Sequence, residues 1–327
     1  MTKIHERDRF CESRGVNSMR LLVSCWIVSG LACLSWCSLL PAVEPIKGLG
    51  PVSRVDLVQG NFQFLEGPTR TPDGSLYFTD IPSQTIHVLS PNGTISVFLT
   101  PSGFANGLMY GGQGRLLACQ MEGQLVGIDL ATKAITVLAG KYQDKRFNAC
   151  NDLVIDKQGG IYFTDPRFRA PDPWPQGTEA FYYRAPDGQV TRLGNDLAAP
   201  NGIILSPDEK TLYVIPSMQR QMVAYQVTEP GKLGERRVFC ELQQPKDNNN
   251  SGGDGLTVDS AGNLYITSAL GVHVYNPGGK LLGIIECPEQ PANVTFGGPD
   301  NKTLYFTARK GLYRCQMEIA GHQFRRE

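Results

Sequence analysis

The sequence predicts an all-β protein built as a six-bladed β-propeller. A strand-forming motif occurs six times at intervals of 40 to 52 residues, which is the size of a propeller blade. Turn residues separate the copies, and the chain holds 36 glycines and 22 prolines. A further strand precedes the first copy and can complete the last one, which would close the ring.

Each copy of the motif starts with a turn, continues with Leu or Ile and usually Tyr, and ends in a β-branched or aromatic run. The first reads Pro-Asp-Gly-Ser-Leu-Tyr-Phe-Thr-Asp at residues 72–80. Such runs between Asp-Gly or Gly-Asn turns are typical of strands joined by hairpins. These windows lack apolar residues at helical spacing, which disfavours a helical repeat. The anchoring residues are Leu76, Leu116, Ile161, Leu212, Leu264 and Leu304.

The ends of the repeat region indicate how the ring closes. The last unit offers three strands, near residues 293–296, 303–307 and 312–315, and lacks a clear fourth. Residues 52–59 form a spare strand, which we expect to pair into the last blade. The propeller is therefore expected at residues 54–316, between a linker at 44–53 and a C-terminal tail at 317–327.

The first 43 residues have the pattern of a targeting segment. Five basic residues lie within residues 1–20, and residues 21–43 carry no charge. This pattern predicts a secretory signal and an exported, periplasmic or extracellular protein. The apolar stretch is also long enough to remain as an uncleaved membrane anchor, and Met19 offers an alternative start.

Charge and cysteine content exclude some classes of function. The 31 basic and 31 acidic residues balance, so there is no electrostatic footprint for nucleic acid. Beyond residue 43 no Cys-x-x-Cys pair occurs, which disfavours a metal-thiolate site. The remaining cysteines are interpreted as small buried hydrophobic residues, with one or two disulfides as the alternative. They are Cys119, Cys150, Cys240, Cys287 and Cys315.

A carboxylate or amide residue lies ten or eleven residues before each anchor. This distance suits the innermost strand of a blade, so the six side chains are expected to converge on the central axis. Asn or Asp at a single strand start is most simply a turn cap, but six matched positions favour a shared site. The residues are Glu66, Asn106, Asn151, Asn201, Asp254 and Asn293.

Converging oxygen atoms at a channel mouth predict one bound divalent cation. Glu66 and Asp254 bring negative charge that is costly to bury unpaired, while Asn151 and Asn201 bring neutral carbonyl oxygens. All-oxygen ligands suit Ca²⁺ best, with Mg²⁺ or Mn²⁺ as alternatives. Zn²⁺ is less favoured because no histidine lies near these positions.

Several segments together resemble the SMP-30/gluconolactonase, or regucalcin-like, family over roughly residues 54–316. They are Glu-Gly-Pro at 66–68, Arg-Phe-Asn-Ala-Cys-Asn-Asp-Leu at 146–153, Ala-Pro-Asn-Gly-Ile at 199–203 and Gly-Asp-Gly-Leu at 253–256. The resemblance implies a metal held by Glu66, Asn201 and Asp254, with Asn151 beside it as a substrate contact or fourth ligand. It also implies that Asp254 is the general base and that Arg146 contacts the substrate.

The expected reaction is hydrolysis of a sugar lactone. No G-x-S-x-G, H-E-x-x-H or P-loop motif offers another chemistry, so the metal is expected to polarise the carbonyl and activate a water. The polar residues Asn106, Asn148 and Asn151 fit a hydroxylated small molecule. Residues 167–177 are expected to form a covering loop, with a simple surface excursion as the alternative. Another metal-dependent esterase or phosphotriesterase, or a ligand-binding propeller with a structural ion, remain alternatives.

Overall fold

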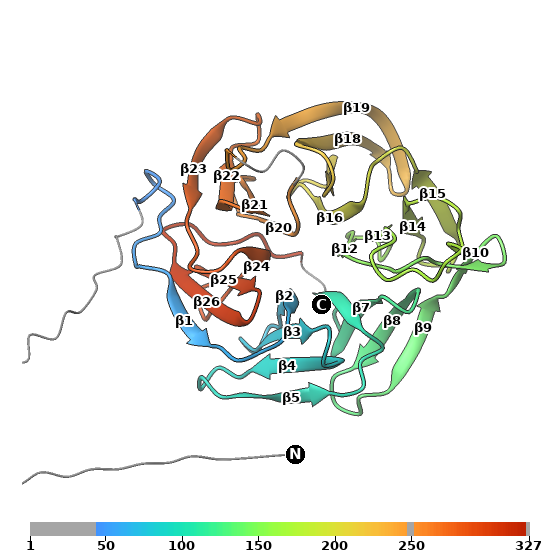
Figure 1. The fold of residues 1–327 in the computed structure, drawn as a ribbon, viewed down its shortest axis with the longest axis horizontal. Helices are drawn as coiled ribbons and strands as arrows, with labels where there is room; N and C mark the ends of the chain where they lie inside the picture. The colour runs from blue at the N-terminus through green and yellow to red at the C-terminus, as the bar shows by residue number, and fades with distance from the viewer. Residues whose placement is uncertain (1–43, 247–251, 325–327) are drawn as a thin grey trace, which may run out of the picture. The chain divides into compact units, whose positions relative to one another are not determined.

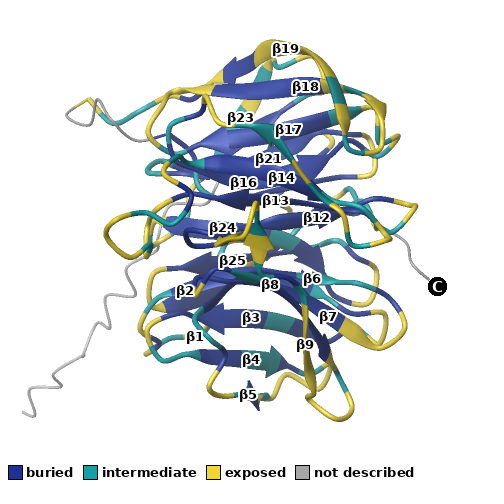
Figure 2. Cartoon of the chain, turned by 90° about the vertical axis from the view of Figure 1, so that its right-hand side faces the viewer, coloured by how far each residue is buried: buried dark blue, intermediate teal, exposed yellow. Residues whose placement is uncertain are grey.

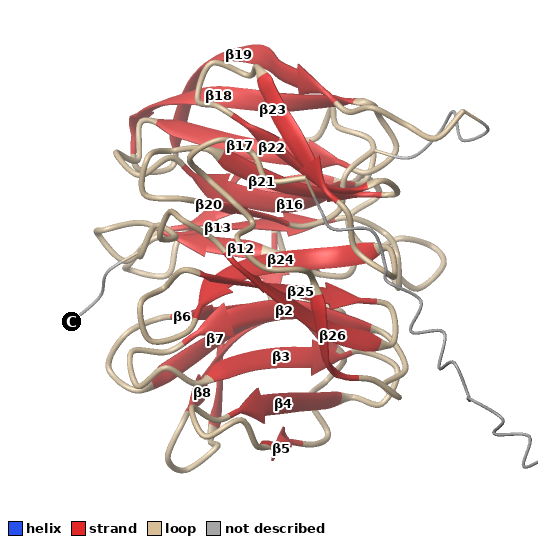
Figure 3. Ribbon diagram, turned by 90° about the vertical axis from the view of Figure 1, so that its left-hand side faces the viewer, coloured by secondary structure: helices blue, strands red, loops and turns tan. Residues whose placement is uncertain are grey.

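The computed structural model describes residues 44–246 and 252–324, and these form a six-bladed β-propeller (Figure 1). No helix occurs among these residues, and so none that could cross a bilayer (Figure 3). The expected targeting segment at 1–43 and the end of the expected tail, 325–327, lie outside the described residues.

Each blade is a four-stranded antiparallel sheet whose first strand faces the central axis. Blade 1 comprises β2 (Leu65–Arg70), β3 (Leu76–Asp80), β4 (Thr85–Leu89) and β5 (Ile95–Leu99). Blade 2 comprises β6 (Ala105–Tyr110), β7 (Arg115–Gln120), β8 (Gln124–Asp129) and β9 (Ile135–Ala139). Blade 3 comprises β12 (Leu153–Ile155), β13 (Ile161–Asp165), β14 (Ala180–Arg184) and β15 (Val190–Gly194).

The second half of the ring has the same plan. Blade 4 comprises β16 (Pro200–Leu205), β17 (Thr211–Pro216), β18 (Gln221–Glu229) and β19 (Lys232–Glu241). Blade 5 comprises β20 (Leu256–Val258), β21 (Leu264–Ser268), β22 (Gly271–Tyr275) and β23 (Leu281–Ile285). Blade 6 comprises β24 (Pro291–Gly297), β25 (Thr303–Ala308), β26 (Gly311–Gln316) and β1 (Asp56–Gln59). A small hairpin of β10 (Lys141–Tyr142) and β11 (Lys145–Arg146) lies between blades 2 and 3 in the chain.

The ring closes as the sequence predicts. The strand β1, from the N-terminal end of the propeller, pairs antiparallel with β26 and supplies the outer strand of blade 6. The first and last parts of the domain are thereby joined in one sheet, which removes an exposed edge.

The core consists of apolar layers between neighbouring blades. One cluster joins blades 3, 4 and 5, and others join blades 1 and 2, 2 and 3, 5 and 6, and 6 and 1. Inner strands are buried because a neighbouring blade covers each face, whereas outer strands such as β9 carry exposed residues (Figure 2). The five described cysteines are free thiols, and four of them are buried, in agreement with their interpretation as small hydrophobic residues.

Candidate functional site

Five of the six predicted polar residues occupy matching places where the inner strands begin. Each anchor residue pairs with an inner-strand residue, and the predicted residue lies four positions before that partner in blades 1 to 5. We call these five residues, together with the equivalent position in blade 6, the channel ring. The five are Glu66, Asn106, Asn151, Asn201 and Asp254.

The prediction for the sixth blade is wrong by one residue. The anchor Leu304 pairs with Phe296, and four positions earlier lies Ala292, not Asn293. The hairpin in blade 6 spans seven residues, 297–303, whereas that in blade 1 spans five, 71–75. A count of eleven residues back from Leu304 therefore ends at Asn293, one residue after the ring position Ala292. Asn293 is equivalent to Asp152 and Gly255, in the layer directly after the ring.

This second layer brings two polar side chains against glycines of the preceding blades. The amide of Asn293 fills the space above Gly255, where an added Cβ would lie 2.1 Å from the Asn293 Cγ atom. The carboxylate of Asp152 lies likewise against Gly107, at 2.5 Å from such a Cβ. Only glycine permits this close approach. The two glycines therefore make room for polar side chains beside the ring.

Carboxylates and amides alternate around the channel. Glu66, Asp152 and Asp254 come from blades 1, 3 and 5; the charges of Asp254 and Asp152 raise the pKa of Glu66, and the charge of Asp254 raises that of Asp152. Burial is the largest cause for all three; it raises the pKa of Asp152 to about 7 and that of Glu66 well above its usual range. The sequence singled out Glu66 and Asp254, and the structure adds Asp152.

Amides from the intervening blades bind two of these carboxylates. The Nδ2 atom of Asn201 donates to Oδ1 of Asp254 at 2.6 Å, and Nδ2 of Asn293 donates to Oε2 of Glu66 at 3.1 Å. Both hydrogen bonds favour the charged carboxylate and partly offset the effect of burial on the pKa. The side-chain amides of Asn106 and Asn151 form no hydrogen bond with any described residue, so they can bind a ligand.

Threonines of the second strands hold the ring in place, and the sequence analysis did not single them out. The hydroxyl of Thr164 donates to the backbone oxygen of Asn201 at 2.7 Å and accepts from the amide of Asp152 at 3.1 Å. Thr79 bonds in the same way to the backbone of Asn106. The sequence pattern could have identified these threonines, because Thr follows Tyr by two residues in four of the six repeats.

The charges of the channel fit a cation. Three carboxylates are buried around the channel, and the charge of Arg309 lowers the pKa of one of them, Asp254. The donor atoms are carboxylate and amide oxygens, which suit a hard divalent ion. Rotating the amide of Asn201 about its last bond would present its oxygen beside Asp254. No group of three or more His, Cys, Asp or Glu ligands gathers within residues 44–246 and 252–324, so a site here depends on asparagine as well.

The structure places the two predicted substrate contacts of the 146–148 segment differently from each other. Arg146 is exposed, and its guanidinium donates to the backbone oxygens of Phe147 and Asn148. Asn148 is fully buried, and both of its amide hydrogens are used by the backbone of Asp165 and Thr178. A contact between Asn148 and substrate would break these bonds, so its position favours a structural role.

Residues 166–179 connect β13 and β14 and include residues 167–177, the segment that was expected to cover the site. Gln176 anchors it, because its Nε2 atom donates to the backbone oxygens of Tyr142, Lys145 and Arg146. Its backbone amide donates to Oδ1 of Asn148. These bonds fix the segment against the β10–β11 hairpin.

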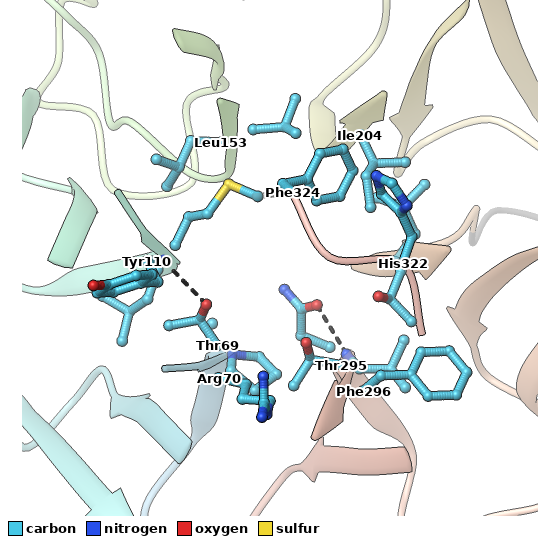
Figure 4. A pocket seen from close by; sticks show the side chains of 18 of the residues that line it. Thr69, Arg70, Tyr110, Leu153, Ile204, Thr295, Phe296, His322 and Phe324 are labelled. Atoms are coloured by element: carbon cyan, nitrogen blue, oxygen red, sulfur yellow. Dashed lines mark hydrogen bonds between the residues drawn. The ribbon is translucent and has the colours of Figure 1, made fainter. Parts of the chain in front are cut away.

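A cavity of about 400 Å³ occupies the channel beyond the second layer (Figure 4). Gly67, Asp152 and Asn293 line its inner end, and Arg70 and Tyr110 lie further along the strands. The C-terminal segment crosses the end of the channel that lies away from the ring, where the backbone amide of His322 donates to the backbone oxygen of Val258. Its last described residue, Phe324, packs against the apolar core near Ile204. The channel is therefore narrowed at this end, and ligand entry is expected from the ring side.

Comparison with known proteins agrees with this architecture. Residues 64–310 match the family model described as SMP-30/gluconolactonase/LRE-like region. The chain belongs to this family. It is 28% identical over 292 residues to a gluconolactonase of Zymomonas mobilis, covering 82% of each chain. It is 29% identical over 255 residues to a pentonolactonase of Haloferax volcanii, covering 75% of this chain and 81% of that protein.

A solved structure supports the same relationship. A gluconolactonase from Xanthomonas campestris superimposes with a TM-score of 0.74 at 30% identity, covering 81% of this chain and 89% of that one. The six-bladed fold and the family predicted from the sequence are thus confirmed.

Proposed function

We propose that this protein is a metal-dependent hydrolase that opens a sugar lactone. The observation that carries the proposal is the burial of Glu66, Asp152 and Asp254 around one channel with amide groups between them. The similarity to gluconolactonases and a pentonolactonase supports the substrate class. Glu66, Asn201 and Asp254 would hold the ion, most simply Ca²⁺, with Asn151 beside it.

When bound, the ion would polarise the lactone carbonyl and lower the pKa of a nearby water. Asp254 is the proposed proton acceptor. Burial raises the pKa of its carboxyl in the metal-free protein, and a bound cation would lower that pKa again, so proton transfer to Asp254 would depend on the ion making the water more acidic. Its Oδ1 atom is held by Asn201 at 2.6 Å, which fixes the orientation of the carboxylate.

The hydroxylated part of the substrate would be bound by amides of the ring. Asn106 and Asn151 are buried at the channel, and their side-chain amides form no hydrogen bond with other described residues. They can donate to and accept from sugar hydroxyls. The anchored segment 166–179 would limit the access of bulk water to the bound lactone.

A substrate panel tests the proposal. The protein would be assayed on five- and six-membered sugar lactones, an aryl ester and a phosphotriester, each with and without a chelator. We expect chelator-sensitive hydrolysis of a sugar lactone above the spontaneous rate. Faster turnover of the ester or phosphotriester would assign another hydrolase activity to the same site. No hydrolysis in a protein that retains one bound ion would favour a ligand-binding propeller instead.

A further inference from the structure

Two phenylalanines form an apolar rim on one side of the channel mouth. Phe64 and Phe104 each lie two residues before a ring residue, Glu66 and Asn106. Both pack against a cluster made by Ile81, Met121 and Ala149. This places them just outside the ring in blades 1 and 2.

The rim is uneven around the mouth. In blades 4 and 5 the positions two residues before the ring hold Ala199 and Gly252, which offer little surface. A substrate bound over the ring would therefore meet aromatic side chains at this position on the side of blades 1 and 2, since blades 3 and 6 hold Ala149 and Gln290 there. Specificity is expected to come from that side.

An arginine side chain lies over the aromatic face of each of these two phenylalanines. The guanidinium carbon of Arg309 is 5.3 Å from the centre of Phe64, and that of Arg169 is 3.7 Å from the centre of Phe104. Arg309 is on the turn between β25 and β26, and one of its nitrogens donates to Oε1 of Gln290 at 2.7 Å. Arg169 is part of the covering segment. Two distant parts of the chain thus bring positive charge to the same rim.

Neither of these arginines forms a salt bridge with a described carboxylate. Among residues 44–246 and 252–324, ion pairs engage Arg54, Arg167, Lys232 and Arg236, and neither Arg169 nor Arg309 is among them. Both side chains belong to exposed residues. The charge of Arg309 also reaches the ring, because it lowers the pKa of Asp254.

A guanidinium group held over an aromatic face is oriented to bind an anion. Stacking fixes the plane of the group and leaves the N–H donors at its edge, in a fork that matches a carboxylate, sulfonate or phosphate. A lactone that offered only hydroxyl groups would have no negative group to bind these guanidinium groups. The arrangement points to a substrate with a negative group away from the lactone carbonyl.

We propose that the preferred substrate is an anionic sugar lactone whose carboxylate, sulfonate or phosphate is bound by Arg309, with Arg169 as a second cationic contact at the rim. This inference rests on the proposed lactonase function. Arg309 is assigned as the principal contact because its guanidinium is oriented by two described neighbours, the ring of Phe64 and the side chain of Gln290, whereas Arg169 is oriented by the ring of Phe104.

Paired substrates test the inference. The value of kcat/KM would be measured for a neutral aldonolactone, for the lactone of an aldaric acid, and for an aldonolactone 6-phosphate. We expect at least one of the two anionic lactones to exceed the neutral one by about 10-fold or more. The Arg309→Gln variant should lose about 10- to 100-fold on that anionic lactone, and Arg169→Gln less. On the neutral lactone each variant should lose clearly less activity than on the anionic one, because the neutral lactone lacks the negative group that the arginine binds.

A matched control is available on an outer strand. Arg237 lies over Phe239 at 5.6 Å on β19, away from the channel, so Arg237→Gln should change neither substrate. The preference for the anion should also fall as NaCl rises from about 0.05 to about 0.5 M. An equal loss on both lactones in Arg309→Gln, or no preference in the wild-type protein, would overturn the inference while leaving the lactonase function intact.

A binding measurement decides the inference if no lactone is hydrolysed. Calorimetry would compare an aldarate, which has two carboxylates, with an aldonate, which has one. Tighter binding of the aldarate that is lost in Arg309→Gln would support the anion site although the lactonase proposal had failed. Equal binding of the two acids would overturn it.

Discussion

Replacing Asp254 with Asn tests whether buried negative charge in the channel destabilises the metal-free fold, so that a bound cation would stabilise it. Burial raises the pKa of Asp254 from 3.8 to about 6. At about 1.4 kcal/mol per unit, the rise of about 2 units costs the metal-free fold about 3 kcal/mol when the carboxyl is charged. The folded carboxyl holds its proton more tightly than the unfolded one, so this cost appears as pH rises from about 4 to about 6 and persists above it.

The variant should therefore be more stable than the wild-type protein in chelator. At pH 8 we expect its melting temperature to be about 6 °C higher, since 1 kcal/mol shifts the melting temperature of a domain of this size by about 2 °C. At pH 4 the difference should vanish. Asn can still accept the hydrogen bond from Asn201, so packing is preserved.

Thermal unfolding followed by fluorescence, at both pH values and with or without Ca²⁺, would measure these shifts. Added metal should reverse the order, because it stabilises the wild-type protein and not the variant. Asp187→Asn is a matched control on an outer hairpin, where Asn can keep the bond to the amide of Gln189, and it should change nothing. A lower melting temperature for Asp254→Asn in chelator at pH 8 would refute the electrostatic reasoning.

Three further variants probe the ring and its supports. Asn151→Ala should raise KM about 10-fold with metal content unchanged by elemental analysis, and a parallel loss of metal would make Asn151 a primary ligand instead. Thr164→Val removes the hydroxyl that bonds to Asn201 and should cost about 1–3 kcal/mol in urea unfolding, together with weaker metal binding by calorimetry; unchanged affinity would mean that this bond does not position the ring. Gly255→Ala places a Cβ 2.1 Å from the Cγ of Asn293 and should lower both melting temperature and lactone turnover. Wild-type behaviour of that variant would contradict the close packing of the second layer.

The sequence predicted the fold because the repeat is local and regular. Each Leu or Ile anchor occupies the second strand of its blade, and the spare strand at 52–59 pairs with β26 as expected. Five ring residues could be found by counting, since their hairpins differ in length by at most one residue. In blade 6 the count failed because the turn before Leu304 is two residues longer than that in blade 1.

Contacts between blades could not be predicted in this way. Arg309 reaches Phe64 only because blade 6 closes against blade 1, which is a property of the ring and not of any repeat. Asn148 offered a polar side chain beside the motif, and its burial against the backbone of residues 165 and 178 depends on the path of the covering segment. Sequence spacing identifies which residues lie in the same layer, but the contacts between them depend on how the six blades close into a propeller.

Restoring metal to a stripped protein tests the central claim most directly. The rate of sugar lactone hydrolysis, corrected for spontaneous opening, would be recorded as Ca²⁺ is titrated into chelator-treated protein. A rate that starts near zero and saturates with one equivalent of tightly bound ion is the predicted result. Full activity in the stripped protein, before any metal is added, would contradict the account.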